Sequence, residues 1–256
     1  MEPILPRIAL VTGGARRIGR TLVETLAEDG FAVAIHCQAS RAEAEALAGQ
    51  ITARGGRACV VVGDLTREDD VAALVPAAER ALGPIGILVN NASVFERDGA
   101  MDATRASWDR HLEANLRAPF ALTQAFARSL PAEAEGLVVN LLDQRVWSLT
   151  PHFLSYTLSK AGLWTLTQTL ALALAPRIRV CGIGPGPTLA NIRQDPEQFA
   201  RQARDVPLGR GPALAEFAAA LRFLIAARGY TGQMLALDGG QHLNWAPIRP
   251  GEEPEE

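Results

Sequence analysis

Residues 12–19 read TGGARRIG, and this stretch decides the fold of the chain. It follows an apolar, strand-like run over residues 7–11 and opens an amphipathic segment over residues 18–29. Gly13 permits a tight turn, and Gly19 lets the following helix pack closely on the sheet. The helix N-terminus attracts a pyrophosphate, so the stretch predicts a strand–loop–helix unit that binds a dinucleotide. The alternative is an ordinary turn that happens to be rich in glycine.

On both sides of this loop, short β-branched runs alternate with Ala-rich amphipathic segments. We expect strands at residues 7–11, 31–37, 58–62, 87–89, 137–141, 179–183 and 234–237. We expect helices at residues 18–29, 40–53, 67–82, 107–129, 155–175 and 212–226. Ser40 is a candidate cap for the second helix. This alternation predicts an α/β fold of the Rossmann type, a doubly wound parallel sheet of about seven strands with helices on both faces. We expect one domain over residues 1–246 and a disordered, Pro- and Glu-rich tail over residues 247–256.

The composition limits the class of protein. Of the 256 residues, 48% are apolar, and the formal net charge is −3 with both signs mixed along the chain. This balance argues against a nucleic-acid or anionic-membrane partner. Cys37, Cys59 and Cys181 are widely spaced, which indicates neither a disulfide framework nor a metal site and fits a cytoplasmic protein with reduced thiols. The longest apolar stretch, residues 161–175, is too short and too polar to span a membrane.

The residues after the second expected strand bear on the choice of cofactor. A carboxylate commonly follows that strand and binds a ribose 2′-hydroxyl. Here the strand runs into Gln38 instead. His36, Ser40, Arg41 and Arg17 could bind a 2′-phosphate by charge-assisted hydrogen bonds. We therefore expect NADP(H) rather than NAD(H); the alternative is that His36 and Arg41 are simply solvated.

Tyr156 and Lys160 lie four positions apart and share one face of the expected helix over residues 155–175. A nearby ammonium favours the phenolate, which makes the Tyr a usable proton donor near neutral pH. The Tyr-x-x-x-Lys pattern alone is weak, since a surface pair on an amphipathic helix gives the same spacing. Its position after the fifth expected strand, in a chain that begins with a nucleotide loop, favours a catalytic pair.

Taken together, these residues resemble the short-chain dehydrogenase/reductase family from residue 7 to about residue 245. The resemblance implies four catalytic residues, Asp143, Tyr156, Lys160 and Asn115, the last of which holds a water in the proton relay. It implies a cofactor site formed by Gly13, Arg16, Arg17, Ile18, Gly19, His36, Ser40, Asp64, Leu65, Asn91, Ala92, Tyr156, Lys160, Pro185 and Gly186. Because family members are usually tetramers, it also implies a homotetramer.

Two departures narrow the resemblance. The family loop is T-G-x-x-x-G-x-G, but its middle Gly is Arg17 here, and the usual Ser thirteen positions before Tyr156 is Asp143. Both departures match the pteridine reductase branch, which includes the dihydromonapterin reductases of bacteria. In that branch a Phe stacks on the pterin and a Ser contacts pterin and cofactor, roles that fall on Phe95 and Ser93. The implied substrate site is Arg17, Ser93, Phe95, Asp143 and Tyr156.

The chemistry of Asp143 favours the same substrate. An ionised carboxylate repels the oxyanion that develops on a carbonyl substrate, whereas it can accept from the N–H groups of a nitrogen-rich ring. We expect NADPH-dependent reduction of a dihydropterin such as dihydromonapterin or dihydrobiopterin, with dihydrofolate as a side substrate, although Arg145 could neutralise Asp143 structurally. A short-chain carbonyl or 3-oxoacyl-type reductase is one alternative. A non-catalytic NADP(H)-binding sensor or scaffold is another.

Overall fold

A parallel sheet of seven strands in the order β3-β2-β1-β4-β5-β6-β7 forms the centre of the molecule. The structure is a computed structural model, and it describes residues 4–190 and 195–243. The strands are β1 (Ile8–Val11), β2 (Ala32–Cys37), β3 (Ala58–Val62), β4 (Ile87–Asn90), β5 (Gly136–Leu141), β6 (Ile178–Pro185) and β7 (Met234–Leu237). The predicted doubly wound α/β fold is confirmed.

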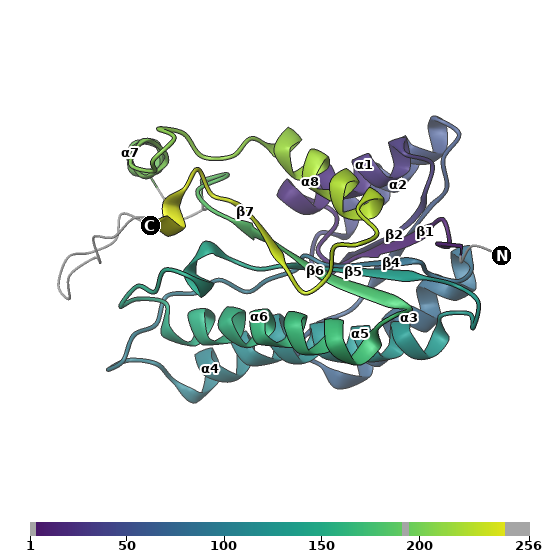
Figure 1. Cartoon of the computed structure of the whole chain (residues 1–256), viewed down its shortest axis with the longest axis horizontal. Coiled ribbons are helices and arrows are strands. Elements are labelled where there is room, and N and C mark those ends of the chain that lie inside the picture. The colour runs from purple at the N-terminus through teal and green to yellow at the C-terminus, as the bar shows by residue number, and fades with distance from the viewer. Residues whose placement is uncertain (1–3, 191–194, 244–256) are drawn as a thin grey trace.

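Helices cover both faces of this sheet (Figure 1). One face carries α1 (Arg17–Glu28), α2 (Arg41–Ala53) and α8 (Leu214–Ala226). The other carries α3 (Glu68–Leu82), α4 (Arg105–Leu112), α5 (Ala118–Ser129) and α6 (Leu154–Leu174). The chain thus forms three layers, with one apolar core on each side of the sheet.

The two cores follow from the period of the strands, in which successive side chains point to opposite faces. In β1, Ala9 and Val11 pack toward α1 and α8, whereas Leu10 packs toward α3 and α5, and all three are fully buried. A strand that is apolar on both faces must be covered on both, which the helices on either side provide.

One expected helix is divided. Residues 107–129 form α4, a π-helical segment over Glu113–Arg117, and α5. The π-helical segment holds Asn115, which is fully buried. Such segments are rare and occur mostly at functional sites. Apolar spacing predicts a continuous helix here because a local change of hydrogen-bond register leaves the pattern nearly intact.

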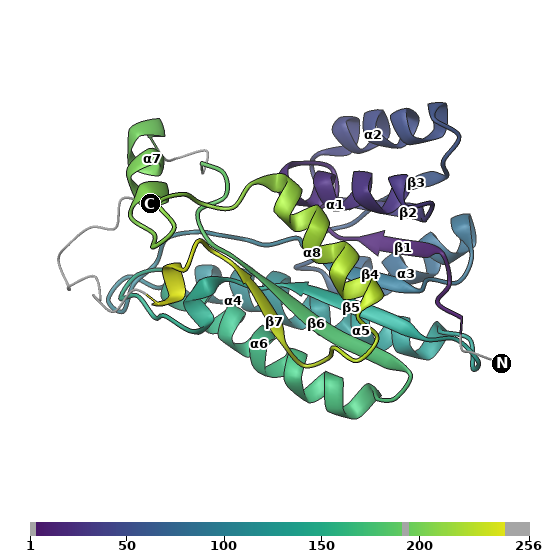
Figure 2. The ribbon, with the colours of Figure 1, turned by 45° about the horizontal axis from the view of Figure 1, so that its top comes forward.

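A further helix, α7 (Pro196–Arg204), was not predicted. Its start is encoded by Asp195, which caps the helix, Pro196 at its first position and Gln198, which completes a capping box. The helix has no buried residue, so no apolar stripe indicated it. It stands apart from the two helical layers, at the end of the molecule where the η3 turn (Gln241–Leu243) lies (Figure 2).

Two other predictions concern the cap of α2 and the C-terminal tail. Ser40 does occupy the N-cap position of α2, but its side chain makes no capping hydrogen bond, so the predicted capping role is wrong. The predicted tail over residues 247–256 lies outside the described residues, and the domain boundary at residue 246 stays a prediction.

Within the described ranges, no helix is long and apolar enough to cross a membrane, and no cluster of His, Cys, Asp and Glu could hold a metal ion.

The first turn of α1 generates a prediction about stability. A Cβ at Gly19 would lie 2.2 Å from the Gly13 carbonyl oxygen and 2.5 Å from Asn91 Nδ2. Gly19→Ala should therefore lower the free energy of unfolding by about 1–3 kcal/mol, because the loop must move. Gly49→Ala is the matched control, since Gly49 lies within α2 with open space around it. The control should raise stability by about 1 kcal/mol. Urea unfolding of both variants measures the difference, and an unchanged Gly19→Ala protein would contradict the close contact.

Candidate active site

Two cavities adjoin at the carboxyl ends of the strands. The first, of about 680 Å³, lies where the sheet order reverses between β1 and β4, the usual ligand position in this kind of fold. The second, of about 460 Å³, lies toward the ends of β5 and β6. Arg17, Ile18 and Ser93 line both cavities. A ligand in the first cavity could therefore reach a ligand in the second.

The glycine-rich loop forms the floor of the first cavity. Gly13 adopts a left-handed backbone with φ of +60°, as its predicted turn requires. Asn91, just past β4, holds the loop, because its Nδ2 donates to the carbonyls of Thr12 (2.8 Å) and Gly13 (3.0 Å). Arg16, the N-cap residue of α1, makes no side-chain capping bond. The first N–H groups of α1 are thus available to an anion.

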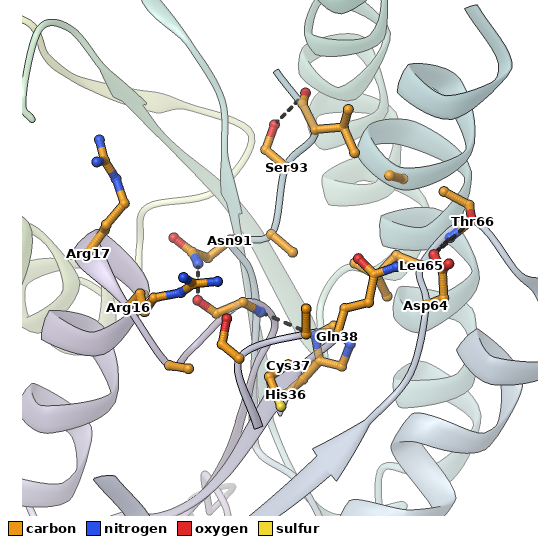
Figure 3. A pocket seen from close by; sticks show the side chains of 18 of the residues that line it. Arg16, Arg17, His36, Cys37, Gln38, Asp64, Leu65, Thr66, Asn91 and Ser93 are labelled. Carbon is orange, nitrogen blue, oxygen red and sulfur yellow. Dashed lines mark hydrogen bonds between the residues drawn. The ribbon is translucent and has the colours of Figure 1, made fainter. Parts of the chain in front are cut away.

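Most residues predicted to hold the cofactor line this cavity. Arg16 and Arg17 extend from the start of α1 on one side, while Asp64 and Leu65 lie on the opposite side (Figure 3). The predicted residues in its wall are Gly13, Arg16, Arg17, Ile18, Gly19, His36, Ser40, Asp64, Leu65, Asn91 and Ala92. Pro185, Gly186 and Tyr156 line the second cavity instead. Their contacts with a cofactor stay a prediction.

His36 has local partners in the structure, and its predicted contact with a cofactor stays a prediction. Both of its ring nitrogens have protein partners: Nδ1 accepts from the backbone N–H of Gly13 (3.2 Å), and Nε2 lies 3.1 Å from the Gly63 carbonyl. The side chain is 2% exposed, and burial lowers its pKa, so the imidazole is neutral. A neutral ring with both nitrogens engaged cannot offer a charge-assisted bond to a phosphate. His36 instead connects the glycine loop to the end of β3.

Arg17 has a left-handed backbone, the conformation that a glycine adopts easily at this position of the loop. Its φ is +54°, a left-handed conformation that costs a non-glycine residue about 1–3 kcal/mol. Its guanidinium donates to the carbonyls of Leu189 (3.0 Å) and Ala190 (2.9 Å), in the segment after β6. Arg17 therefore joins the phosphate loop to the far wall of the second cavity. Its predicted contacts with a cofactor phosphate and a substrate remain predictions.

Asp64 also has a local partner. Its Oδ1 accepts from the backbone N–H (2.9 Å) and the hydroxyl (2.7 Å) of Thr66. These hydrogen bonds, led by the backbone one, lower the pKa of Asp64. The carboxylate therefore fixes the turn after β3 at the edge of the first cavity.

The predicted catalytic pair lies beside the second cavity. The Tyr156 hydroxyl donates to Asp143 Oδ2 at 2.7 Å, which joins α6 to the end of β5. Lys160 Nζ donates to the Leu141 carbonyl (2.7 Å) and lies 5.8 Å from the Tyr156 ring centroid. Burial lowers the pKa of Lys160 to about 8, although attraction by Asp143 partly offsets this. A buried lysine that is still charged at neutral pH favours proton release by the phenol.

Asp143 accepts from three donors. Besides Tyr156, the backbone N–H of Arg145 donates to Oδ1 (2.8 Å) and the Arg145 guanidinium lies 3.4 Å from Oδ2. These contacts belong to a single 3₁₀ turn, Gln144–Val146, that follows Asp143. Each of the two carboxylate oxygens of Asp143 therefore has a hydrogen-bond donor.

Phe95 contacts Tyr156 and Phe153 beside the second cavity. Its ring stacks on Phe153 with centroids 4.4 Å apart and meets Tyr156 edge-on at 4.7 Å. All five residues of the predicted substrate site line the second cavity: Arg17, Ser93, Phe95, Asp143 and Tyr156. The residues of this wall that sequence reasoning missed include Phe199 and Gln202 of α7 and Gln241 of η3. The missed helix explains the first two omissions.

Asn115 organises the site from behind. Its Oδ1 accepts from the backbone N–H of Val94 (2.8 Å) and the hydroxyl of Ser93 (3.2 Å). Its Nδ2 donates to the Val94 carbonyl (2.9 Å) and to Ser159 Oγ (3.0 Å). The side-chain amide thus connects the segment after β4 to α6. The predicted role of Asn115 in holding a relay water stays a prediction.

The N-terminus of α6 is held by residues that the sequence did not indicate. Phe153, its N-cap residue, has a left-handed backbone (φ +58°) and makes no side-chain capping bond. Asp98, on the loop after β4, substitutes for the cap. Its Oδ1 accepts from the Ser155 N–H (3.1 Å), and its Oδ2 accepts from the Ser155 hydroxyl. His111 Nδ1 lies 2.6 Å from the same hydroxyl, so α4 is joined to this network.

The Asp98 network generates a second prediction. Hydrogen bonds from Ser155 and Ser107 outweigh the effect of burial and lower the pKa of Asp98, so the carboxylate is ionised. Asp98→Asn should cost about 1.5–3 kcal/mol of unfolding free energy, because bonds to a charged acceptor are lost. Asp109→Asn is the control, since its pair with Arg105 is exposed and should contribute little to stability. Equal urea midpoints for the two variants would contradict the capping role.

Comparison with known proteins agrees with this geometry. The family model described as short chain dehydrogenase matches residues 7–200. The solved structure of FolM alternative dihydrofolate reductase 1 from Brucella canis, complexed with NADP, is 53% identical. The similarity covers 96% of this chain and 98% of that one, with a TM-score of 0.92. The FolM alternative dihydrofolate reductase 1 of Brucella suis, also in complex with NADP, is 54% identical over 93% of this chain and 96% of its own, with a TM-score of 0.91.

A more distant relative is a reductase named for a different substrate. The 3-oxoacyl-[acyl-carrier-protein] reductase FabG of Staphylococcus epidermidis is 29% identical over 241 residues. The match covers 92% of this chain and 98% of the relative. A family model that spans most of the chain, with relatives aligned along nearly their whole length, confirms the family predicted from the loop and the Tyr–Lys pair. The chain belongs to the short chain dehydrogenase family.

Proposed function

We propose that this protein reduces a dihydropterin to its tetrahydro form with NADPH. One observation carries the proposal: the Tyr156 hydroxyl donates to Asp143 at 2.7 Å in the wall of a cavity that also contains Phe95. A carboxylate beside the proton donor suits a substrate rich in N–H groups. The names of the two Brucella relatives, alternative dihydrofolate reductases, support a substrate of this kind.

The first cavity fits a dinucleotide phosphate. The loop at Gly13 and the uncapped start of α1 offer backbone N–H groups, while Arg16 and Arg17 add positive charge. At the end of β2 the wall contains Gln38 and Ser40 rather than a carboxylate. The usual carboxylate that would repel a 2′-phosphate does not follow β2, which favours NADPH over NADH. Both Brucella structures contain NADP.

The second cavity would hold the pterin. Phe95 offers an aromatic ring for stacking, and its position is fixed by the parallel contact with Phe153. Asp143 would accept hydrogen bonds from the ring N–H and amino groups. Ser93 lines both cavities and would contact substrate and cofactor together.

Side chains of the protein would protonate the substrate. The reduced nicotinamide supplies a hydride to the carbon of the C=N bond. Tyr156 would supply the proton to the nitrogen, and Lys160 would stabilise the phenolate left on Tyr156. Because Lys160 is buried among fixed groups, its charge acts in a medium of low dielectric constant and its effect is strong.

A carbonyl or 3-oxoacyl reductase is the second candidate, favoured by the similarity to the FabG protein. Against it stands the carboxylate of Asp143, which would repel a developing oxyanion at the position where a hydroxyl donor is wanted. A non-catalytic NADP(H) sensor or scaffold would have no need of the Tyr156–Asp143 bond.

We also propose a homotetrameric, cytoplasmic enzyme. Leu158 and Leu172 of α6 are 46% and 82% exposed, which provides apolar surface for a partner subunit. Cys37, Cys59 and Cys181 are free thiols, as expected in a reducing compartment.

A substrate test separates the candidates. The wild-type protein should oxidise NADPH when a dihydropterin is added and should be slower with NADH. Asp143→Ser should lower kcat/KM for the pterin about 10²-fold or more, because the carboxylate beside Tyr156 is lost. Asp109→Ser is the control, since Asp109 lies on the exposed surface of α4. Unchanged pterin turnover by Asp143→Ser, together with faster reduction of a 3-oxoacyl substrate, would favour the second candidate instead.

The low pKa of Lys160 predicts a pH dependence. Lys160 is protonated below about pH 8 and loses its charge as the pH rises through that value. The cation that favours the phenolate is then absent, so kcat for pterin reduction should fall above about pH 8. A pH profile at saturating NADPH measures this limb. Lys160→Met should be slow at all pH values and lack the limb; a variant that retains the same limb would show that another group titrates.

A further inference from the structure

Arg145 is a buried cation beside the catalytic carboxylate. Its side chain is 7% exposed, and that of Asp143 is 13% exposed. The Arg145 guanidinium lies 3.4 Å from Asp143 Oδ2, the same oxygen that accepts from the Tyr156 hydroxyl. Two donors, one of them charged, therefore converge on one carboxylate oxygen.

Arg145 also contacts the aromatic end of the site. Its guanidinium carbon lies 5.7 Å from the Phe95 ring centroid and 5.3 Å from that of Phe153. A planar guanidinium can contact an aromatic ring and a carboxylate at the same time, and the rings hold the cation without adding negative charge. One side chain thus joins the carboxylate to the ring proposed to stack on the substrate.

We infer that Arg145 is a positioning residue that holds the Asp143 carboxylate as a hydrogen-bond acceptor, so that Tyr156 alone supplies the proton. For the identity of the substrate, this inference rests on the proposed function. The electrostatic effect concerns only the side chains of Arg145, Asp143 and Tyr156 and needs no substrate. Asp143 would accept hydrogen bonds from the substrate and from Tyr156 without giving up a proton itself.

The physical reason is the cost of burying a charge. A carboxylate removed from water is destabilised unless it is paired and hydrogen-bonded. Arg145 supplies both the countercharge and a backbone N–H, which donates to Asp143 Oδ1 at 2.8 Å. With Arg145 and Lys160 positive and Asp143 negative, one positive charge remains near Tyr156. That excess favours the phenolate that forms when Tyr156 donates its proton.

The other ionisable groups around Tyr156 are engaged elsewhere. Lys160 Nζ donates to the Leu141 carbonyl on the β5 side, and Arg17 across the cavity donates to Leu189 and Ala190. From α4, the His111 ring lies 6.0 Å from that of Tyr156, and burial lowers its pKa, which makes it neutral.

Two carboxylates on neighbouring elements also have partners. Asp98, on the loop beside α4, is bonded to Ser155, and Asp238 beside η3 is bonded to His242 at 2.7 Å. Neither carboxylate replaces Asp143 as the acceptor of the hydrogen bond from the Tyr156 hydroxyl.

The chain offers a direct test because it contains two tyrosines, Tyr156 and Tyr230. In a Tyr230→Phe background, the tyrosinate absorbance reports the ionisation of Tyr156 alone. Arg145→Met should shift this ionisation to higher pH by about one to three units, because Asp143 then acts on Tyr156 without a countercharge. Arg145→Lys should restore most of the wild-type value. Arg54→Met, a change of an exposed arginine at the end of α2, is the matched control.

A double-mutant cycle shows whether Arg145 acts through Asp143. In an Asp143→Asn background only the direct effect of the Arg145 charge on Tyr156 remains, so Arg145→Met should shift the Tyr156 titration less. An equal shift in both backgrounds, or no shift from Arg145→Met in the wild-type background, would overturn the inference. Arg145→Gln serves as a second uncharged variant if the Met variant fails to fold, and NADPH binding verifies folding.

The titration needs no substrate, so it gives a result even if the protein turns over no dihydropterin. Absence of pterin turnover with the predicted Tyr156 shifts would reject the proposed function and leave the role of Arg145 standing. If the pterin is turned over, Arg145→Met should lower kcat about tenfold or more and move the acid limb of the kcat profile to higher pH, since the ionised Asp143 has lost its countercharge. A change in KM alone would contradict an action through proton transfer.

Discussion

The hydrogen bond from the Tyr156 hydroxyl to Asp143 is the interaction on which the site depends. It joins the end of strand β5 to the first turns of helix α6. Both ends must be fixed for a 2.7 Å contact to persist. Lys160, bonded to the Leu141 carbonyl, fixes the helix to the strand, and Asp98 fixes the start of the helix through Ser155. Residues far from the chemistry thereby determine where the proton donor lies.

The same principle applies to the glycine loop. Asn91 holds the carbonyls of Thr12 and Gly13, and His36 accepts from the Gly13 N–H, so the loop is held from β4 and from β2. Arg17 keeps a left-handed backbone at a position that would suit glycine, and its guanidinium reaches the segment after β6. A strained residue at this position is consistent with a functional role, since such strain persists only where the surrounding structure holds it.

Much of this arrangement could be predicted from the sequence. The alternation of apolar runs gave the strands nearly residue by residue, because a doubly covered sheet needs strands that are apolar on both faces. The spacing of Tyr156, Lys160 and Asp143 predicted one catalytic group, because helix geometry and the end of β5 place them together. Helix α7 was missed because it buries nothing, although its capping residues could have indicated it.

The fold, the loop at residues 12–19 and the placement of Tyr156 and Lys160 on one helix face follow from the sequence alone, since each depends on short spacings within one or two elements. Only the tertiary structure decided how the polar side chains are used. His36 became a buried link between the glycine loop and the end of β3, Asn115 filled its hydrogen bonds with the segment at Ser93 and Val94, and Arg145 became the partner of Asp143. A hydrogen bond depends on distances of a few tenths of an ångström between distant segments, and no local pattern in the chain encodes those distances.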